Sequence, residues 1–383
     1  MNENESRRSR VDALEAWFTI VAFILALTVW LALTLIQESK RISTFEQRIL
    51  AAMPTYDASA GGLAQYRRGL EDYLDDHLAF RNLAVSLHAR AKVGWLGSSP
   101  SPKVIVGKQG WFFLNDEVAV RQYRGLARLD TPQLETWRRV LEARRDWLAE
   151  RGIAFVLVLV PNKHQIYPEF MPDRLPRIGV EEQHAQLARY LAEHSTVQVV
   201  DLMPSLLEAK RGQRVYHRTD THWNDVGAYL AYRKILEAVA LALPQYAEVL
   251  RPVEVELERY TDKGIGLTSM IGLSDVYREE VLQLVQLDPQ SQILMDMKKP
   301  YKVLEREQRP LAHGVPGAAL PRAVVFRDSF ANALIPFLSE NFRRVLYVWT
   351  RDVEARFVER EKPDIVIQQV AGRLLDRTPI GIR

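Results

Sequence analysis

The chain has 383 residues, of which 47% are hydrophobic and 26% are charged, with a net charge of +3 and no cysteine. This length and apolar content are enough for one large domain or two ordinary domains with a sizeable core. The small net charge, without a basic stripe interleaved with aromatic residues, argues against a nucleic-acid partner. The lack of cysteine excludes disulfides, thiolate catalysis and cysteine-bound metals.

Residues 16–36 form an uncharged stretch near the start of the chain. In a helix this stretch would span roughly 30 Å, the thickness of the hydrocarbon core of a bilayer. Arg7, Arg8 and Arg10 precede it, which favours a cytoplasmic amino terminus. A cleaved signal peptide is the alternative, but the run is long for one and no small-x-small site follows it. We expect a cytoplasmic segment over residues 1–15 and an uncleaved transmembrane anchor over residues 16–36.

Residues 37–100 are predicted to form a helical stalk that becomes a packed subdomain. Apolar residues recur there at intervals of three and four, with acidic residues between them. His77 lies on the apolar face, where a structural histidine is favoured over a ligand. A stretch rich in glycine, serine and proline at residues 97–102 then breaks the pattern, so we expect the next domain to cover residues 101–383.

Helix and strand patterns alternate along this next domain. A short hairpin comes first, over residues 104–114, and Thr131 then caps a helix whose first position is Pro132. Nearly continuous apolar runs, typical of strands covered on both faces, follow. The predicted strands cover residues 153–160, 197–201, 323–326, 345–349 and 364–370, and two of the predicted helices cover residues 180–194 and 225–243. The alternation predicts an α/β fold with a parallel sheet flanked by helices.

Ser329 is expected at the turn between the strand at residues 323–326 and a helix over residues 330–341. A serine at this position exposes its hydroxyl at the carboxyl edge of the sheet, beside helix amides that could stabilise an oxyanion. The alternative is that Asp328 and Ser329 are an ordinary turn and N-cap. On this segment alone the capping interpretation is favoured.

A second segment offers a base for this serine. Asp220 lies two residues before His222, so in an extended loop the carboxylate could hold the Nδ1 proton while Nε2 faces a serine. A solvated polar loop is one alternative. A metal site is disfavoured because no third ligand lies at a helpful spacing. Together with Ser329, the pair indicates acyl transfer by a serine nucleophile, with no metal and no cofactor.

Six short motifs follow one another between residues 75 and 366, over most of the chain. They are DDHLAFR at 75–81, GKQGWFF at 107–113, PNKHQIYPE at 161–169, TDTHWN at 219–224, FRDSF at 326–330 and KPDIV at 362–366. In content and order they resemble the AlgJ and AlgX family of alginate O-acetyltransferases. The resemblance implies an SGNH-hydrolase-like domain and a triad of Ser329 as nucleophile, His222 as base and Asp220 as its orienting partner.

The resemblance further implies transfer of an acetyl group to hydroxyls of a secreted bacterial polysaccharide. The implied partners are the polysaccharide acceptor, a polytopic membrane-bound O-acyltransferase that donates the acetyl group, and other proteins of the export complex. The chain shows no obvious carbohydrate-binding module, so it is more similar to the membrane-anchored AlgJ type than to the longer AlgX type. This implies a single-pass protein of the inner membrane with its catalytic domain in the periplasm.

Lys163 and Tyr167 follow the strand at residues 153–160 and are candidate substrate-binding residues at the carboxyl edge of the sheet. An exposed loop charge and a packed aromatic are equally good interpretations of these two residues. Arg327 is a third candidate, because it could meet carboxylates of an anionic sugar polymer; the alternative is an acidic partner inside the domain.

Two positions depart from the pattern of the resembled family. Arg327 stands where wider SGNH enzymes have glycine before the Asp-Ser pair, which leaves the Ser329 amide as a candidate oxyanion donor and the second donor unassigned. Gly372 stands before Arg373, where an acidic residue is expected. Two alternatives to a transferase therefore stay open: an esterase in which water replaces the sugar hydroxyl, and a non-catalytic polysaccharide-binding scaffold.

Overall fold

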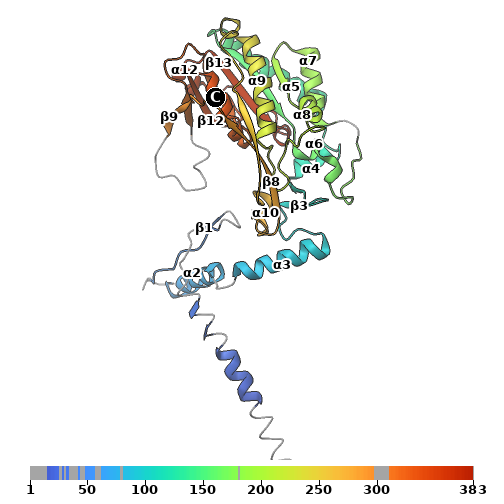
Figure 1. The fold of residues 1–383 in the computed structure, drawn as a ribbon, viewed down its shortest axis with the longest axis vertical. Helices are drawn as coiled ribbons and strands as arrows, with labels where there is room; N and C mark the ends of the chain where they lie inside the picture. The colour runs from blue at the N-terminus through green and yellow to red at the C-terminus, as the bar shows by residue number, and fades with distance from the viewer. Residues whose placement is uncertain are drawn as a thin grey trace, which may run out of the picture. The chain divides into compact units, whose positions relative to one another are not determined.

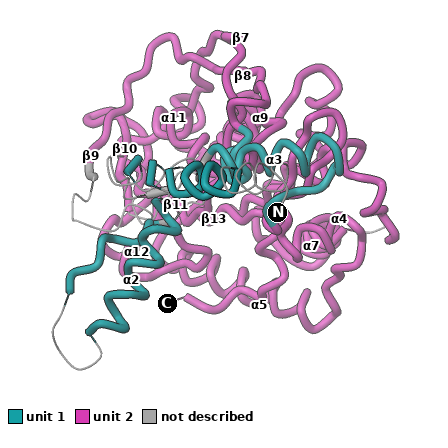
Figure 2. Tube along the Cα trace, turned by 90° about the horizontal axis from the view of Figure 1, so that it is seen from below, with its two compact units in different colours: residues 1–101, 269–273 teal, residues 102–268, 274–383 magenta. Residues whose placement is uncertain are grey.

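The computed structural model describes residues 15–25, 28–29, 32–33, 42–43, 48–56, 62–77, 81–179, 182–296 and 310–382. The chain divides into two compact units, coloured separately in Figure 2. Unit 1 consists of Met1–Ser101 and Ser269–Leu273, and unit 2 of Pro102–Thr268 and Ser274–Arg383. Every site residue selected from the sequence belongs to unit 2.

Helices α2 (Gly62–His77) and α3 (Arg81–Leu96) make up most of the described part of unit 1. Strands β1 (Ile42–Ser43) and β2 (Arg48–Ile49) form a short antiparallel pair. The Nδ1 atom of His77 lies 2.9 Å from the carbonyl oxygen of Tyr73, and the two rings stack. These are the contacts of a structural histidine.

The predicted transmembrane segment at residues 16–36 lies partly outside the described residues. Helical backbone is present at residues 15–25, 28–29 and 32–33. In the ranges that the structure describes, no helix combines the length and the apolar character needed to cross a bilayer. The anchor and the domain limits drawn from the sequence therefore stay predictions.

A seven-stranded sheet forms the centre of unit 2 (Figure 1). Its strand order is β6-β5-β13-β11-β12-β10-β9, in which the strands from β6 to β12 are parallel and β10 pairs antiparallel with both β12 and β9. The strands are β5 (Ala154–Val160), β6 (Gln198–Asp201), β9 (Gln292–Asp296), β10 (Leu311–Gly314), β11 (Arg322–Arg327), β12 (Arg344–Trp349) and β13 (Ile365–Ala371). The predicted parallel sheet is confirmed, and the antiparallel edge was not predicted because neither β9 nor β10 carries a long apolar run.

Helices cover both faces of this sheet, because alternate residues of a strand point to opposite sides. Val158 of β5 packs in a core with α9 and α11, and its neighbour Leu157 packs in a second core with α5, α7 and α12. The helices after residue 101 are α4 (Glu117–Tyr123), α5 (Thr131–Ala149), α6 (Lys163–Ile166), α7 (Gln183–His194), α8 (Met203–Ala209), α9 (Asp225–Ala242), α10 (Leu267–Met270), α11 (Ile335–Leu338) and α12 (Ala355–Glu361).

Two antiparallel hairpins accompany the sheet. The predicted hairpin is present as β3 (Val104–Val106) and β4 (Phe112–Leu114). The second hairpin, β7 (Val255–Lys263) with β8 (Arg278–Gln286), was not predicted. Its strand β7 is largely exposed and lacks the apolar run by which the other strands were recognised.

Three local predictions need correction. Helix α5 is capped by Asp130 rather than Thr131: the Asp130 carboxylate accepts from the Gln133 amide at 2.8 Å, and the Gln133 side chain accepts from the Asp130 amide at 2.9 Å. This reciprocal capping box places Pro132 in the second helical position. Strand β6 was expected to be buried but is only half-buried, because it lies at the edge of the sheet.

The third correction concerns the segment after Ser329, which is not one helix. It consists of the 3₁₀ turn η4 (Ser329–Ala333), α11 and the 3₁₀ turn η5 (Ser339–Asn341). Pro336 has no amide hydrogen, so the bond to the carbonyl of Asn332 that a continuous helix requires cannot form. The apolar face expected for this segment is nevertheless confirmed, since Phe330, Leu334, Phe337 and Leu338 are all buried.

Candidate active site

Ser329 follows β11, a central strand, at the carboxyl edge of the sheet. The preceding Asp328 holds the turn: its carboxylate accepts from the Phe330 amide, the Gln369 side chain and the Ala371 amide, each at 2.9 Å. The last two donors lie on β13, so the turn is tied to the neighbouring strand. Because the Phe330 amide is bonded to Asp328, it is not a free second oxyanion donor.

The side chains of Ser329, His222 and Asp220 form one chain of hydrogen bonds. His222 Nε2 lies 2.8 Å from Ser329 Oγ, and His222 Nδ1 lies 2.6 Å from Asp220 Oδ1. The same carboxylate oxygen accepts from the His222 amide at 2.9 Å. A carboxylate that holds the Nδ1 proton leaves Nε2 free to accept the serine proton. The structure thus brings together the three residues selected from the sequence, although 107 positions separate His222 from Ser329.

The Asp220 carboxyl carries the charge that this arrangement needs. Burial acts to raise its pKa, but the hydrogen bond from His222 and the charge of His222 outweigh burial and hold the pKa of Asp220 well below its usual range. The group is therefore an ionised carboxylate over the physiological range. Such a group stabilises an imidazolium ion.

Aromatic contacts fix the orientation of the His222 ring. The Phe330 ring meets it edge to face with a centroid distance of 4.9 Å, and the Trp223 indole donates to the Phe330 carbonyl at 3.0 Å. The guanidinium of Arg373 lies 5.6 Å from the centroid of the same Phe330 ring. Arg373 therefore places a positive charge near the site, a role for which its position in the sequence carries no signal.

Lys163 is buried, which corrects the interpretation as an exposed loop charge. Its side chain is 1% exposed, and its ammonium donates to the carbonyls of Phe112 at 2.6 Å, Arg218 at 2.8 Å and Asp220 at 2.8 Å. Burial lowers the pKa of Lys163 to about 7, although the carboxylates of Asp220 and Glu279 oppose this shift.

Tyr167 and Arg327 are buried as well. The Tyr167 hydroxyl accepts from the Val215 amide at 2.9 Å, and its ring packs on Trp111. Arg327 donates to the side chain of Asn332 at 2.5 Å and lies 4.4 Å from the ring centroid of Trp349. These contacts are structural, and a contact of Lys163, Tyr167 or Arg327 with substrate stays a prediction.

Gly266 is a residue of the site that sequence reasoning missed. Its φ is +49°, and a Cβ atom built on it would lie 1.6 Å from Asp220 Oδ2. Only glycine therefore allows the backbone to pass this close to the Asp220 carboxylate. The signal in the sequence was the Gly264-Ile265-Gly266 stretch after the charged residues of β7.

The depressed pKa of Lys163 predicts how its contribution to stability depends on pH. In the unfolded chain the amine stays protonated up to about pH 10.5, whereas in the folded protein it loses its proton above about pH 7. The unfolded state then binds more protons between these values, so the free energy of unfolding rises with pH by at most about 1.4 kcal/mol per pH unit. The charged and titratable groups around Lys163 are Asp220, Glu279, Arg214 and Arg218.

Urea unfolding of the wild type and of Lys163→Met at pH 7, 8 and 9 measures this contribution. Most other groups titrate equally in both proteins, so their effects cancel when one unfolding free energy is subtracted from the other. We expect the unfolding free energy of the wild type, minus that of Lys163→Met, to increase as the pH rises. A difference that stays constant from pH 7 to 9 would show that Lys163 remains charged in the folded protein.

A parallel sheet with a serine at its carboxyl edge, hydrogen-bonded to a histidine and an aspartate, defines a hydrolase-like α/β protein with a serine site. A family model described as "SGNH hydrolase-like domain, acetyltransferase AlgX" matches residues 104–303, more than half of the chain. The chain belongs to this AlgJ/AlgX family of SGNH-like acetyltransferases. The matched range contains Asp220 and His222 and ends before Ser329.

Curated relatives carry the name "Probable alginate O-acetylase AlgJ". The Pseudomonas syringae protein is 26% identical over 269 residues, which cover 69% of this chain and 60% of that protein. The Pseudomonas aeruginosa protein is 27% identical over 248 residues, covering 63% and 56%, and the Azotobacter vinelandii protein is 28% identical over 211 residues, covering 55% and 52%. The matches thus span between half and three fifths of the length of these relatives.

Two solved structures were compared with this fold, and the one with the higher TM-score supports it. Bacillus cereus PatB1 matches with a TM-score of 0.52 and 15% identity, over 72% of this chain and 99% of that one. The O-acetyltransferase domain of Pseudomonas putida AlgJ matches with a TM-score of 0.47 and 19% identity, over 73% and 94%. At its level of identity the PatB1 likeness shows a shared fold and nothing about activity.

Proposed function

We propose that this chain is a membrane-anchored O-acetyltransferase that acetylates hydroxyls of a secreted, alginate-like bacterial polysaccharide through an acetyl-serine intermediate on Ser329. The observation that supports the proposal most is the hydrogen-bonded chain from Ser329 Oγ to His222 Nε2 and from His222 Nδ1 to Asp220. The names of the AlgJ relatives support the choice of acetyl group and polymer.

The first half-reaction loads the serine. His222 Nε2 takes the Ser329 proton as Oγ attacks the acetyl carbonyl of the donor, and Asp220 stabilises the imidazolium that forms. The Ser329 amide is the candidate donor for the oxyanion of the tetrahedral intermediate. Collapse of this intermediate breaks the bond to the leaving group, which takes the proton from His222 and leaves acetyl-Ser329.

The second half-reaction runs the same steps with a different nucleophile. A sugar hydroxyl loses its proton to His222 Nε2 and attacks the acetyl-serine carbonyl, and the proton then returns to Ser329 Oγ as the ester bond breaks. The products are the acetylated sugar and free Ser329. His222 Nε2 accepts a proton first from Ser329 Oγ and then from the sugar hydroxyl. The acetyl donor and the sugar must therefore bind in turn on the same side of His222.

The location and the partners belong to the same proposal. The uncharged stretch at residues 16–36 would anchor the chain in the inner membrane, with unit 2 in the periplasm. A polytopic membrane-bound O-acyltransferase would supply the acetyl group there, and other proteins of the export complex would deliver the polymer. No cofactor is needed for either half-reaction.

Mass spectrometry of the full chain after incubation with an activated acetyl ester tests the nucleophile. We expect one acetyl group on the peptide that contains Ser329, and no adduct on the same peptide of Ser329→Ala. An acetyl group on another residue at the wild-type rate in Ser329→Ala would overturn the assignment.

The acceptor separates a transferase from an esterase. With alginate oligosaccharides present, we expect the acetyl group to leave Ser329 faster and to appear on the sugar. Release of acetate at one rate with every acceptor and without any would favour an esterase, because water would then be the natural nucleophile.

A further inference from the structure

Two buried charged residues hold the loop that carries Asp220. Glu279 lies on β8 and is 0% exposed, and Lys163 lies at the start of α6 and is 1% exposed. A buried carboxylate or ammonium is costly unless it is paired and hydrogen-bonded. What these two side chains bond to therefore indicates what they do.

Glu279 bonds to the two residues directly before Asp220. One carboxylate oxygen, Oε1, accepts from the Arg218 amide at 3.0 Å. The other oxygen, Oε2, accepts from the Thr219 amide at 2.8 Å and from the Thr219 hydroxyl at 2.6 Å. All three are charge-assisted hydrogen bonds, which are about twice as strong as neutral ones. Both oxygens of the carboxylate are needed to accept them.

Thr219 is held from its other side by the segment that leads into α10. The Thr219 hydroxyl accepts from the Ile265 amide at 3.0 Å, and the Thr219 carbonyl accepts from the Leu267 amide at 3.0 Å. Between these two contacts, Gly266 passes against the Asp220 carboxylate. Every polar atom of Thr219 is therefore bonded, and Asp220 follows a residue whose position is fully determined.

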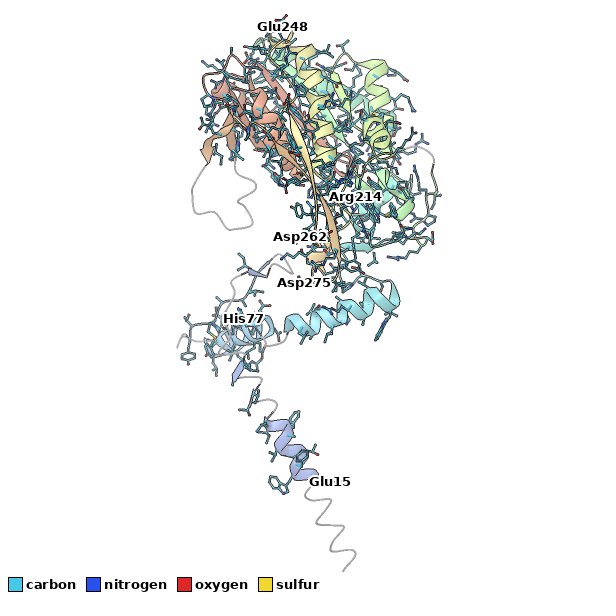
Figure 3. All side chains as sticks on the ribbon, viewed as in Figure 1. Glu15, His77, Arg214, Glu248, Asp262 and Asp275 are labelled. Carbon is cyan, nitrogen blue, oxygen red and sulfur yellow. The ribbon has the colours of Figure 1, made fainter. Side chains whose placement is uncertain are left out.

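Lys163 adds two contacts to the same short segment. Its ammonium donates to the carbonyls of Arg218 and Asp220, each at 2.8 Å. Positive charge also lies near Glu279 itself, since Arg214 Nη2 is 3.3 Å from Glu279 Oε1. Arg214 is labelled in Figure 3 beside the β7–β8 hairpin. The amides of residues 218 and 219 are thus bonded to the Glu279 carboxylate, and the carbonyls of residues 218 and 220 to the Lys163 amino group.

We infer that Glu279 is a positioning residue for catalysis, which acts through Thr219 to hold Asp220 against His222. Lys163 supports the same segment from the carbonyl side. The inference rests on the proposed function, because Glu279 can position Asp220 for catalysis only if the Asp220–His222 pair takes part in a reaction. Displacement of a catalytic group by about 1 Å can lower a rate about 10²-fold.

The substitution Glu279→Gln tests the inference, because an amide presents one acceptor oxygen and turns an N–H group toward a backbone N–H or the hydroxyl. We expect the maximal rate of Ser329 acetylation by an activated acetyl ester to fall between about 10-fold and 100-fold, with an unchanged KM for the ester. Glu280→Gln is the matched control: Glu280 is the next residue on β8, its side chain is 52% exposed, and the variant should react at the wild-type rate.

A second pair of variants keeps the test valid if Glu279→Gln does not fold. Thr219→Val removes the hydroxyl and preserves the shape of the side chain, whereas Thr219→Ser keeps the hydroxyl. We expect Thr219→Val to lose rate with an unchanged KM and Thr219→Ser to retain most of the rate.

Three results would overturn the inference: wild-type rates in folded Glu279→Gln, a change confined to KM, or equal losses in Thr219→Val and Thr219→Ser. Failure of the proposed function gives a different result. In that case the wild-type chain itself would form no adduct on Ser329, and the inference would fall with it.

Discussion

The substitution Asp220→Asn is expected to lower the rate of Ser329 acetylation about 10⁴-fold while leaving the fold intact, as comparable changes in serine triads do. The Asp220 carboxylate accepts the Nδ1 proton of His222 at 2.6 Å. An asparagine of the same shape can turn its amide N–H toward Nδ1, which favours the tautomer with the proton on Nε2. That tautomer presents a donor to Ser329 and cannot take its proton. Single-turnover acetylation followed by mass spectrometry measures the loss, with circular dichroism as the check on folding.

A pair of histidine variants controls this prediction. His222→Ala should be at least as inactive as Asp220→Asn, whereas His217→Ala should be mild, because His222 and not His217 is bonded to Ser329. Equal inactivity of the two histidine variants, both folded, would show that the base has been assigned to the wrong histidine or that both serve a metal.

Replacing Gly266 by alanine should lower the acetylation rate by about 10²-fold or more. The new methyl group would lie 1.6 Å from Asp220 Oδ2, so the carboxylate or the backbone at residue 266 must move. The displaced carboxylate no longer meets His222 Nδ1 at hydrogen-bond distance. Because Asp220 is proposed to orient the base and not to bind the ester, we expect the maximal rate to fall more than the KM for the ester changes.

The matched control for Gly266→Ala is Gly317→Ala. Gly317 also has a positive φ, +78°, but a Cβ atom on it would have no heavy atom within 4 Å. Both variants therefore carry the backbone strain of a left-handed alanine, and only the Gly266→Ala methyl group meets the Asp220 carboxylate. Equal activity of the two variants would show that the Asp220 carboxylate can shift without affecting the reaction.

The parallel sheet and the candidates Ser329, His222 and Asp220 could be predicted from local patterns in the sequence. The strands of the parallel sheet could be predicted because most of them carry continuous apolar runs, which are typical of strands covered on both faces. Ser329 could be selected because a predicted strand precedes it and apolar residues at helical spacing follow it. The Asp220–His222 pair could be selected because the two residues are only two positions apart. Each of these signals lies within a few neighbouring positions.

The contacts between residues that are distant in the sequence become visible in the folded structure. The convergence of His222 with Ser329 depends on the strand order of the sheet, and the antiparallel β9 and β10 edge depends on how the chain turns back. Lys163 is buried where α6 meets β4 and the Asp220 loop, and the contacts of Glu279 with Thr219 follow from the packing of β8 against the same loop. These partners lie far apart in the sequence, so no periodicity or local motif indicates that they are in contact. Their contact depends on the folding of the whole domain.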